Sequence, residues 1–138
     1  MESVTAKGFA KQLDILAGID CWQVVGGGMR GIASRVQFSG IDYRSFTVRY
    51  KRASGVTTEY EKRKLAIYGD RGLLYPYLTV QAYLTKGNEF MSAGIIKTKD
   101  LFDCLDDIKI YETRATKSDG NIFRFVRWSK IKKLVQIV

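Results

Sequence analysis

The sequence contains no histidine, one proline and two cysteines among its 138 residues. Without an imidazole, Ser-His-Asp and Cys-His catalytic systems and histidine-ligated zinc sites are excluded in their usual forms. Cys21 and Cys104 stand beside apolar residues, so we expect both to be reduced and buried rather than metal ligands. Any catalysis would therefore depend on carboxylates, lysine, tyrosine or a metal held by carboxylates, and no cofactor is predicted.

Long apolar runs are absent as well. No stretch approaches the roughly 18–20 residues that span a membrane, and residues 1–4 lack the basic start and apolar continuation of a signal peptide. With 46% hydrophobic and 27% charged residues, the chain can fold around one core without disulfides or metals. We expect one domain over residues 1–138, away from membranes, in the cytoplasm, on a nucleoid, or in a host cytoplasm if the protein is viral.

Three segments have the apolar spacing of helices. Residues 3–18 form an amphipathic stretch that begins at a serine suited to cap a helix and ends at a glycine. A short closing helix is expected over residues 130–136. The middle helix, capped by Thr98, is expected to bury Leu101, Phe102, Leu105 and Ile108.

Most of the remaining chain alternates between apolar and polar residues, as strands do. Gly87-Asn88 and Asp119-Gly120 are turn sequences that predict two hairpins. In the first hairpin, Val80 faces Ile95, and the apolar face of the pair is expected to pack on the core. The predicted strands cover residues 22–25, 32–38, 44–52, 77–84, 91–96, 110–116 and 122–128.

Residues 56–62 allow two structures. As a returning strand, they place Glu59 opposite Arg49, a favourable cross-strand pair. As a helix over residues 59–68, they would be capped by Thr58 with Glu61 in a capping box. We favour the strand, which gives an α+β fold with an N-terminal helix followed by an antiparallel β-meander, a middle helix, a final hairpin and a short C-terminal helix.

The net charge of +9 is unevenly distributed along the chain. Residues 44–71 carry eight basic and three acidic side chains, and residues 108–138 carry eight and two, whereas residues 1–43 are neutral and residues 72–107 are net acidic. Basic clusters in a compact fold usually form a basic face, which is typical of nucleic-acid binders. We therefore expect binding to DNA or RNA with little sequence preference.

The two basic segments suggest which residues make the contacts. The expected solvent face of residues 44–52 presents groups that bind phosphate. In the final hairpin, Phe123 and Phe125 share a face with arginines, so they form either a base-stacking platform or, if a helix covers them, part of the core. The predicted nucleic-acid-binding residues are Arg30, Arg44, Arg49, Lys51, Arg52, Arg114, Phe123, Phe125, Arg127 and Lys130.

Two short motifs resemble known nucleotide- or nucleic-acid-binding signatures. Residues 123–128 resemble part of the second aromatic motif of RRM domains, but the basic-glycine pair that precedes this motif is missing and the element order differs. Residues 26–31 spell GxGxxG, but an alternating segment follows instead of a long helix. We interpret residues 26–31 as a hairpin loop with Arg30 at its tip.

A metal-dependent nuclease is the first alternative function. A helix followed by a β-meander resembles PD-(D/E)XK nucleases, which hold Mg²⁺ with strand carboxylates beside a lysine. The resemblance implies ligands among Asp42, Glu59, Glu61 and Asp70, with Lys51 or Lys62 as the basic partner. The Pro-Asp element is missing, and Arg49-Tyr50-Lys51 stands where Glu-x-Lys is required, so we expect no divalent-metal nuclease activity, and the sequence carries no positive sign of another enzymatic activity.

The second alternative is a structural or assembly protein, such as a viral one, whose basic patch meets nucleic acid or an acidic partner. Eight tyrosines and exposed strand edges would suit a homo-oligomer interface.

Overall fold

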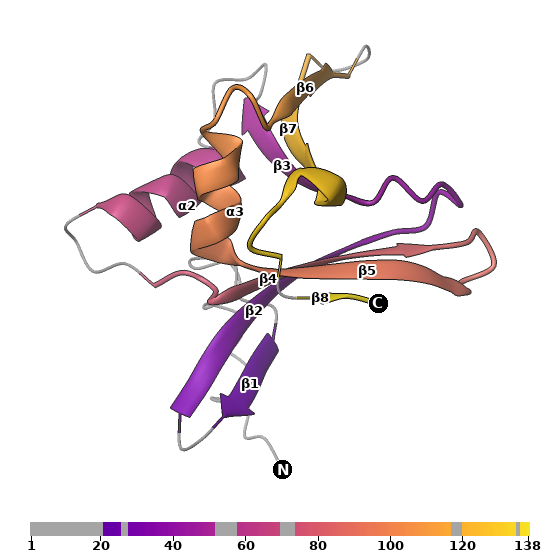
Figure 1. Cartoon of the computed structure of the whole chain (residues 1–138), viewed down its shortest axis with the longest axis horizontal. Helices are drawn as coiled ribbons and strands as arrows, with labels where there is room; N and C mark the ends of the chain where they lie inside the picture. The colour runs from indigo at the N-terminus through magenta and orange to yellow at the C-terminus, as the bar shows by residue number, and fades with distance from the viewer. Residues whose placement is uncertain (1–20, 26–27, 52–57, 70–73, 117–119, 135) are drawn as a thin grey trace.

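A computed structural model of the chain describes residues 21–25, 28–51, 58–69, 74–116, 120–134 and 136–138 (Figure 1). The strands in this part of the chain form two sheets. Sheet A has the strand order β1-β2-β4-β5-β8, and sheet B has the order β3-β7-β6. Sheet A comprises β1 (Cys21–Val25), β2 (Gly28–Gln37), β4 (Leu78–Leu84), β5 (Phe90–Lys97) and β8 (Gln136–Ile137). Sheet B comprises β3 (Ser45–Lys51), β6 (Glu112–Ala115) and β7 (Ile122–Arg127).

Sheet B stands with its edge strand β3 against one face of sheet A. The Thr47 amide donates to Gln81 Oε1 at 2.7 Å, and the Ser45 amide donates to the Tyr83 hydroxyl at 3.2 Å. That hydroxyl in turn donates to the Ser45 carbonyl at 2.6 Å. Three backbone groups at the open edge of β3, the two amides and the Ser45 carbonyl, are thereby bonded to side chains of β4 instead of to another strand.

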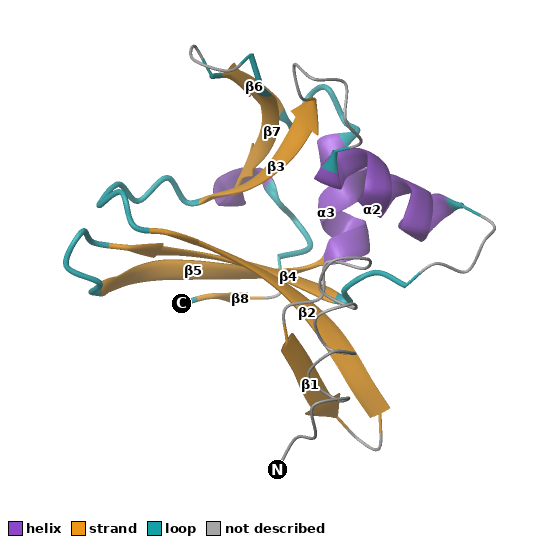
Figure 2. Cartoon of the chain, turned by 180° about the vertical axis from the view of Figure 1, so that it is seen from behind, coloured by secondary structure: helices purple, strands orange, loops and turns teal. Residues whose placement is uncertain are grey.

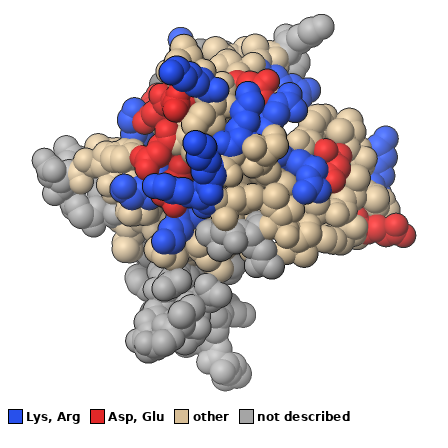
Figure 3. Space-filling view, in the orientation of Figure 1, with Lys and Arg blue, Asp and Glu red and all other residues tan. Residues whose placement is uncertain are grey.

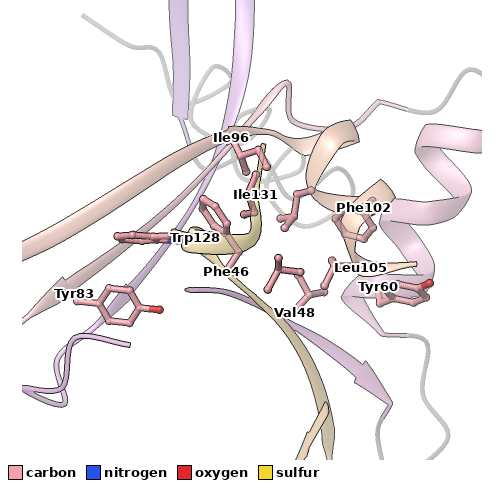
Figure 4. Packing of buried hydrophobic residues seen from close by; sticks show 11 residues of the cluster. Phe46, Val48, Tyr60, Tyr83, Ile96, Phe102, Leu105, Trp128 and Ile131 are labelled. Carbon is pink, nitrogen blue, oxygen red and sulfur yellow. The ribbon is translucent and has the colours of Figure 1, made fainter. Parts of the chain in front are cut away.

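Sheet B and the helices α2 (Glu59–Tyr68) and α3 (Thr98–Leu105) lie on the same side of sheet A (Figures 1 and 2). One face of sheet B packs against the helices and supplies much of the core. Figure 4 shows this core running from Tyr83 and Trp128 through Phe46 and Val48 to Phe102 and Tyr60.

Gly94 of β5 makes room for Trp128 at this junction. A Cβ atom on Gly94 would lie 2.5 Å from the indole ring. The indole of Trp128 is buried and lies 5.8 Å from the Tyr83 ring, centroid to centroid. A residue without a side chain is therefore needed where the indole meets sheet A.

The α+β class is correct, but the expected element sequence is wrong. The N-terminal helix expected over residues 3–18 lies outside the described residues, and the first element described is strand β1. Sheet A is not a simple antiparallel meander, because β2 and β4 are parallel, with Ile32 opposite Leu78. The chain between these two strands crosses over through β3 and α2, which a meander does not allow.

Residues 59–68 form helix α2, so the favoured strand is wrong and the alternative helix is confirmed. The Thr58 hydroxyl accepts from the Glu61 amide at 3.3 Å and donates to the Tyr50 carbonyl at 3.1 Å. The cap therefore starts the helix and ties it to β3 at the same time. Glu59, expected opposite Arg49, instead lies 3.5 Å from Arg35 of β2.

The first hairpin has the expected turn, and its register is as expected except at Leu84, which a bulge places opposite Phe90 instead of Met91. Val80 faces Ile95 and Ala82 faces Ala93, and Asn88 at the turn has a left-handed φ of 66°. The face expected in the core is only half-buried, because sheet B and the helices cover the other face. The buried residues of the hairpin are Gln81, Tyr83, Ser92, Gly94 and Ile96.

The C-terminal part differs from the expected short helix. A 3₁₀ turn, η1 (Trp128–Lys130), follows β7, and the chain then returns to sheet A as β8. In α3, Leu101, Phe102 and Leu105 are buried as expected, but Ile108 lies beyond the helix and is 79% exposed.

Cys104 is a free thiol, half-buried rather than fully buried, and burial raises the pKa of this thiol. No helix in the described part of the chain is long and apolar enough to cross a bilayer.

Candidate functional site

The face of sheet B that points away from the core forms one wall of an open groove of about 600 Å³. The C-terminal half of β2 and the segment before β3 supply the rest of the lining. We call this site the arginine groove. Its basic residues are Arg35, Arg49, Arg114 and Arg127, its aromatic residues are Tyr43, Phe123 and Phe125, and its other residues are Val36, Gln37, Ser45, Thr47 and Thr116. No acidic side chain of the described residues lines it.

Strand pairing explains why these residues meet. Arg49 of β3 lies opposite Phe123 of β7, which lies opposite Arg114 of β6, so one row across sheet B reads arginine, phenylalanine, arginine. Side chains directly opposite each other on paired strands point to the same face. The guanidinium carbon of Arg49 is 5.4 Å from the centre of the Phe123 ring, within the range of a cation–π contact.

The next row continues the same face. Phe125 lies between Thr47 and Glu112, and the guanidinium carbon of Arg127 is 5.7 Å from its ring centre. A two-residue turn at Asp119-Gly120 predicts Lys117 opposite Ile122, whereas in the structure Ala115 lies opposite Ile122, a shift of two residues. Because side chains alternate with a period of two, a shift of two residues leaves the faces unchanged.

Phe123 and Phe125 are half-buried, and neither belongs to the core cluster. The helices that could have covered them pack against the opposite face of sheet B, with Phe46, Val48 and Val126. Both rings therefore form part of the wall of the arginine groove.

The arginines of the groove differ in their acidic partners. Arg127 Nε donates to a Glu112 oxygen at 2.7 Å, and this hydrogen bond lowers the pKa of the Glu112 carboxyl below its ordinary value. Arg35 lies 3.5 Å from Glu59. In the described part of the chain Arg49 and Arg114 form no ion pair, and the buried Nε of Arg49 has no hydrogen-bond partner there. Two guanidinium groups of the groove thus have no acidic partner among the described residues.

Five of the predicted binding residues line the arginine groove: Arg49, Arg114, Phe123, Phe125 and Arg127. The other predicted binding residues that the structure describes do not line it. Lys51 is exposed at the end of β3, and Arg30 lies within β2 opposite Gln23 rather than at a loop tip. Arg52 lies outside the described residues.

Arg44 and Lys130 are exposed but do not line the arginine groove. Arg44 has a left-handed φ of 48°, and its guanidinium carbon lies 5.3 Å from the centre of the Trp128 ring and its Nη1 3.8 Å from Asp42. Lys130, in η1, lines a separate hollow with Asp100 and Asp103.

Basic and acidic side chains are mixed on the face of the molecule that carries α2 and α3 (Figure 3). Lys64 Nζ lies 3.2 Å from Asp106, and Lys133 Nζ lies 3.9 Å from Asp100. These pairs offset much of the charge there, so this face is not the continuous basic surface that the charge clustering led us to expect.

Sequence analysis missed Arg35 and Tyr43. Arg35 faces the groove because the parallel pairing of β2 with β4 places it opposite Gln81, on the side covered by sheet B. Tyr43 lies 5.9 Å from the Arg114 guanidinium carbon, measured to the ring centre. Both positions depend on the packing of one sheet against the other, and neither residue stands in a motif.

The described residues among the proposed metal ligands do not form a site. Among the described residues, no three Asp, Glu, Cys or His side chains are close enough to hold a metal ion. Asp42 accepts from the Ser92 hydroxyl at 2.6 Å, Glu61 is exposed on α2, and Asp70 lies outside the described residues.

Residues 28–31 of the GxGxxG sequence belong to strand β2, which pairs with β1 as an antiparallel hairpin, and no helix follows them. The hairpin is therefore as expected, but residues 28–31 lie in its strand instead of in its loop. The arginine groove thus combines guanidinium groups, which bind anions, with aromatic rings.

No family model, no curated protein and no solved structure matches this chain.

Proposed function

We propose that the protein binds nucleic acid with little sequence preference, and that the arginine groove is the binding site. The observation that carries this proposal is the lining of the groove: four arginines and three aromatic rings, with no acidic side chain among the described lining residues. Guanidinium groups bind phosphate through paired hydrogen bonds, and aromatic rings stack on bases. A nucleic acid supplies both groups at a regular spacing.

The low sequence preference follows from the chemistry of the lining. Stacking and phosphate contacts use features that every nucleotide has. The polar groups that could distinguish base edges are partly occupied, because the backbone amides of Ser45 and Thr47 and the hydroxyl of Ser45 bond to Tyr83 or Gln81. The exposed Lys51 lies two residues beyond Arg49 and extends the positive charge past the groove.

A salt titration tests the proposal. Fluorescence anisotropy with a labelled mixed-sequence oligonucleotide pool should show binding that weakens steeply with salt, with a log–log slope of about −0.7 to −0.9 for each phosphate neutralised. Arg114→Ala removes an exposed groove arginine and should reduce that slope by about one.

Lys62→Ala is the matched control, since Lys62 is exposed on α2 outside the arginine groove and its removal causes the same charge change. This variant should bind like the parent protein. Absence of binding at low salt, binding insensitive to salt, or equal losses in both variants would each contradict the proposal.

A further inference from the structure

We infer that the arginine groove selects single-stranded over double-stranded nucleic acid, holding unpaired bases against Phe123 and Phe125 and phosphates at Arg49 and Arg114. This inference rests on the proposed function and adds the form of the ligand. Three features of the groove support it: its size, the position of its rings and the arrangement of charge beside them.

The size of the groove suits a short stretch of single strand. Its volume of about 600 Å³ falls within the roughly 300–1,000 Å³ of sites that enclose one small-molecule ligand. Nucleotides entering singly fit such a space. A duplex is too wide to enter and would meet only the exposed arginines at the rim.

The rings of the groove require bases whose faces are free. In a duplex each base is stacked between its neighbours, so its face is covered, whereas unpaired bases can lie against an aromatic side chain. Phe123 and Phe125 are successive residues on one face of β7, and a strand places such residues about 7 Å apart. Each ring therefore serves a different base.

Charge and rings alternate in the way a nucleotide chain requires. Across sheet B, Phe123 lies between Arg49 and Arg114. Arg49 forms no ion pair with any described residue, so its guanidinium charge lies uncompensated by those residues beside the ring. A nucleotide carries its phosphate close to its base, so the row of Arg49, Phe123 and Arg114 can contact both groups of one nucleotide.

The test compares a labelled 12-nucleotide mixed-sequence single strand with a duplex of the same length at equal ionic strength. The single strand should bind about tenfold or more tightly than the duplex. Phe125→Ala should weaken single-strand binding about tenfold, with the salt slope nearly unchanged and duplex binding unaffected. Phe125→Leu keeps an apolar side chain at this half-buried position and should show the same loss, which guards against a folding defect in the alanine variant.

Phe90→Ala is the control, because Phe90 is 56% exposed at the start of β5 and does not line the groove. It should bind the single strand like the parent. Equal or tighter duplex binding, or Phe125 variants that weaken both forms alike, would overturn the inference and leave the proposed function standing. A free mononucleotide that competes as well as the 12-mer would also overturn it, whereas failure of both forms to bind at low salt would refute the proposed function itself.

Discussion

Strand β7 shows how neighbouring residues take opposite roles at the residue scale. Between the two phenylalanines of the groove wall, Arg124 points to the other face of sheet B. Its guanidinium carbon lies 3.7 Å from the centre of the Tyr50 ring and 4.2 Å from that of Tyr111. It also donates to the Leu105 carbonyl at 3.0 Å, and its side chain is only 15% exposed. Arg124 therefore stabilises the fold, and the number of basic residues overstates the charge that a ligand meets.

Glu112 binds Arg127, so under the proposed function it would compete with a phosphate for this arginine, which gives a prediction at this scale. Its carboxylate accepts a hydrogen bond from Arg127 Nε at 2.7 Å at the edge of the groove. Glu112→Gln removes the negative charge and leaves Arg127 available for phosphate, so it should tighten nucleic-acid binding by about two- to fivefold. The measurement is the same anisotropy titration, at low salt, where exposed charges are least screened.

The pH dependence has a defined sign. Because the hydrogen bond from Arg127 lowers the pKa of Glu112, the pair stabilises the fold above the ordinary glutamate pKa, and this stabilisation is lost as the pH falls through the lowered value. The pair is intact at neutral pH, so the gain of Glu112→Gln should stay constant from about pH 6 to 8. Glu61→Gln, an exposed carboxylate on α2 outside the groove, should bind like the parent. A similar gain in that variant would contradict a local role for Glu112.

At the scale of elements, the helix-capping residues predicted α2 better than the alternation of apolar and polar residues did. The favoured strand depended on a cross-strand pair between Arg49 and Glu59 that the structure does not contain. The cap at Thr58 depended only on neighbouring residues, and its hydrogen bond from the Glu61 amide is present. In the final hairpin, alternation alone placed the faces correctly although the register was shifted by two residues.

Thr58 has two hydrogen bonds that fix α2, so Thr58→Ala should lower the free energy of unfolding by about 1–2 kcal/mol. The alanine loses both the cap to the Glu61 amide and the bond to the Tyr50 carbonyl. Urea unfolding followed by circular dichroism measures the change, and Thr58→Ser, which keeps the hydroxyl, should recover most of it. Thr113→Ala, at an exposed position of β6, should cost much less. Equal losses at the two threonines would show that the cap contributes little.

The whole molecule has a groove because two sheets meet at an angle, and the sequence carries no direct sign of this junction. The arginines and phenylalanines of sheet B follow from hairpin alternation. The opposite wall depends on the parallel pairing of β2 with β4 and on bonds from Gln81 and Tyr83 to the edge of β3. These contacts join residues more than thirty positions apart, so short-range patterns do not reveal them. The wall of the groove that sheet A supplies therefore could not be predicted from the sequence.

Tyr83 fixes the junction between the sheets, and this gives the last prediction. Its buried hydroxyl contacts the Ser45 amide, carbonyl and hydroxyl and accepts from Gln81 at 3.0 Å. Tyr83→Phe keeps the ring but leaves these buried groups unsatisfied, so unfolding should become easier by about 1–3 kcal/mol. Because sheet B would be held less firmly over Arg35, nucleic-acid binding should weaken while the salt slope stays unchanged, since no charge is lost. Tyr75→Phe, at a half-buried tyrosine outside the groove, is the matched control. Tyr83→Phe protein that is folded by circular dichroism and binds like the parent would show that the arginine groove keeps its shape without this junction.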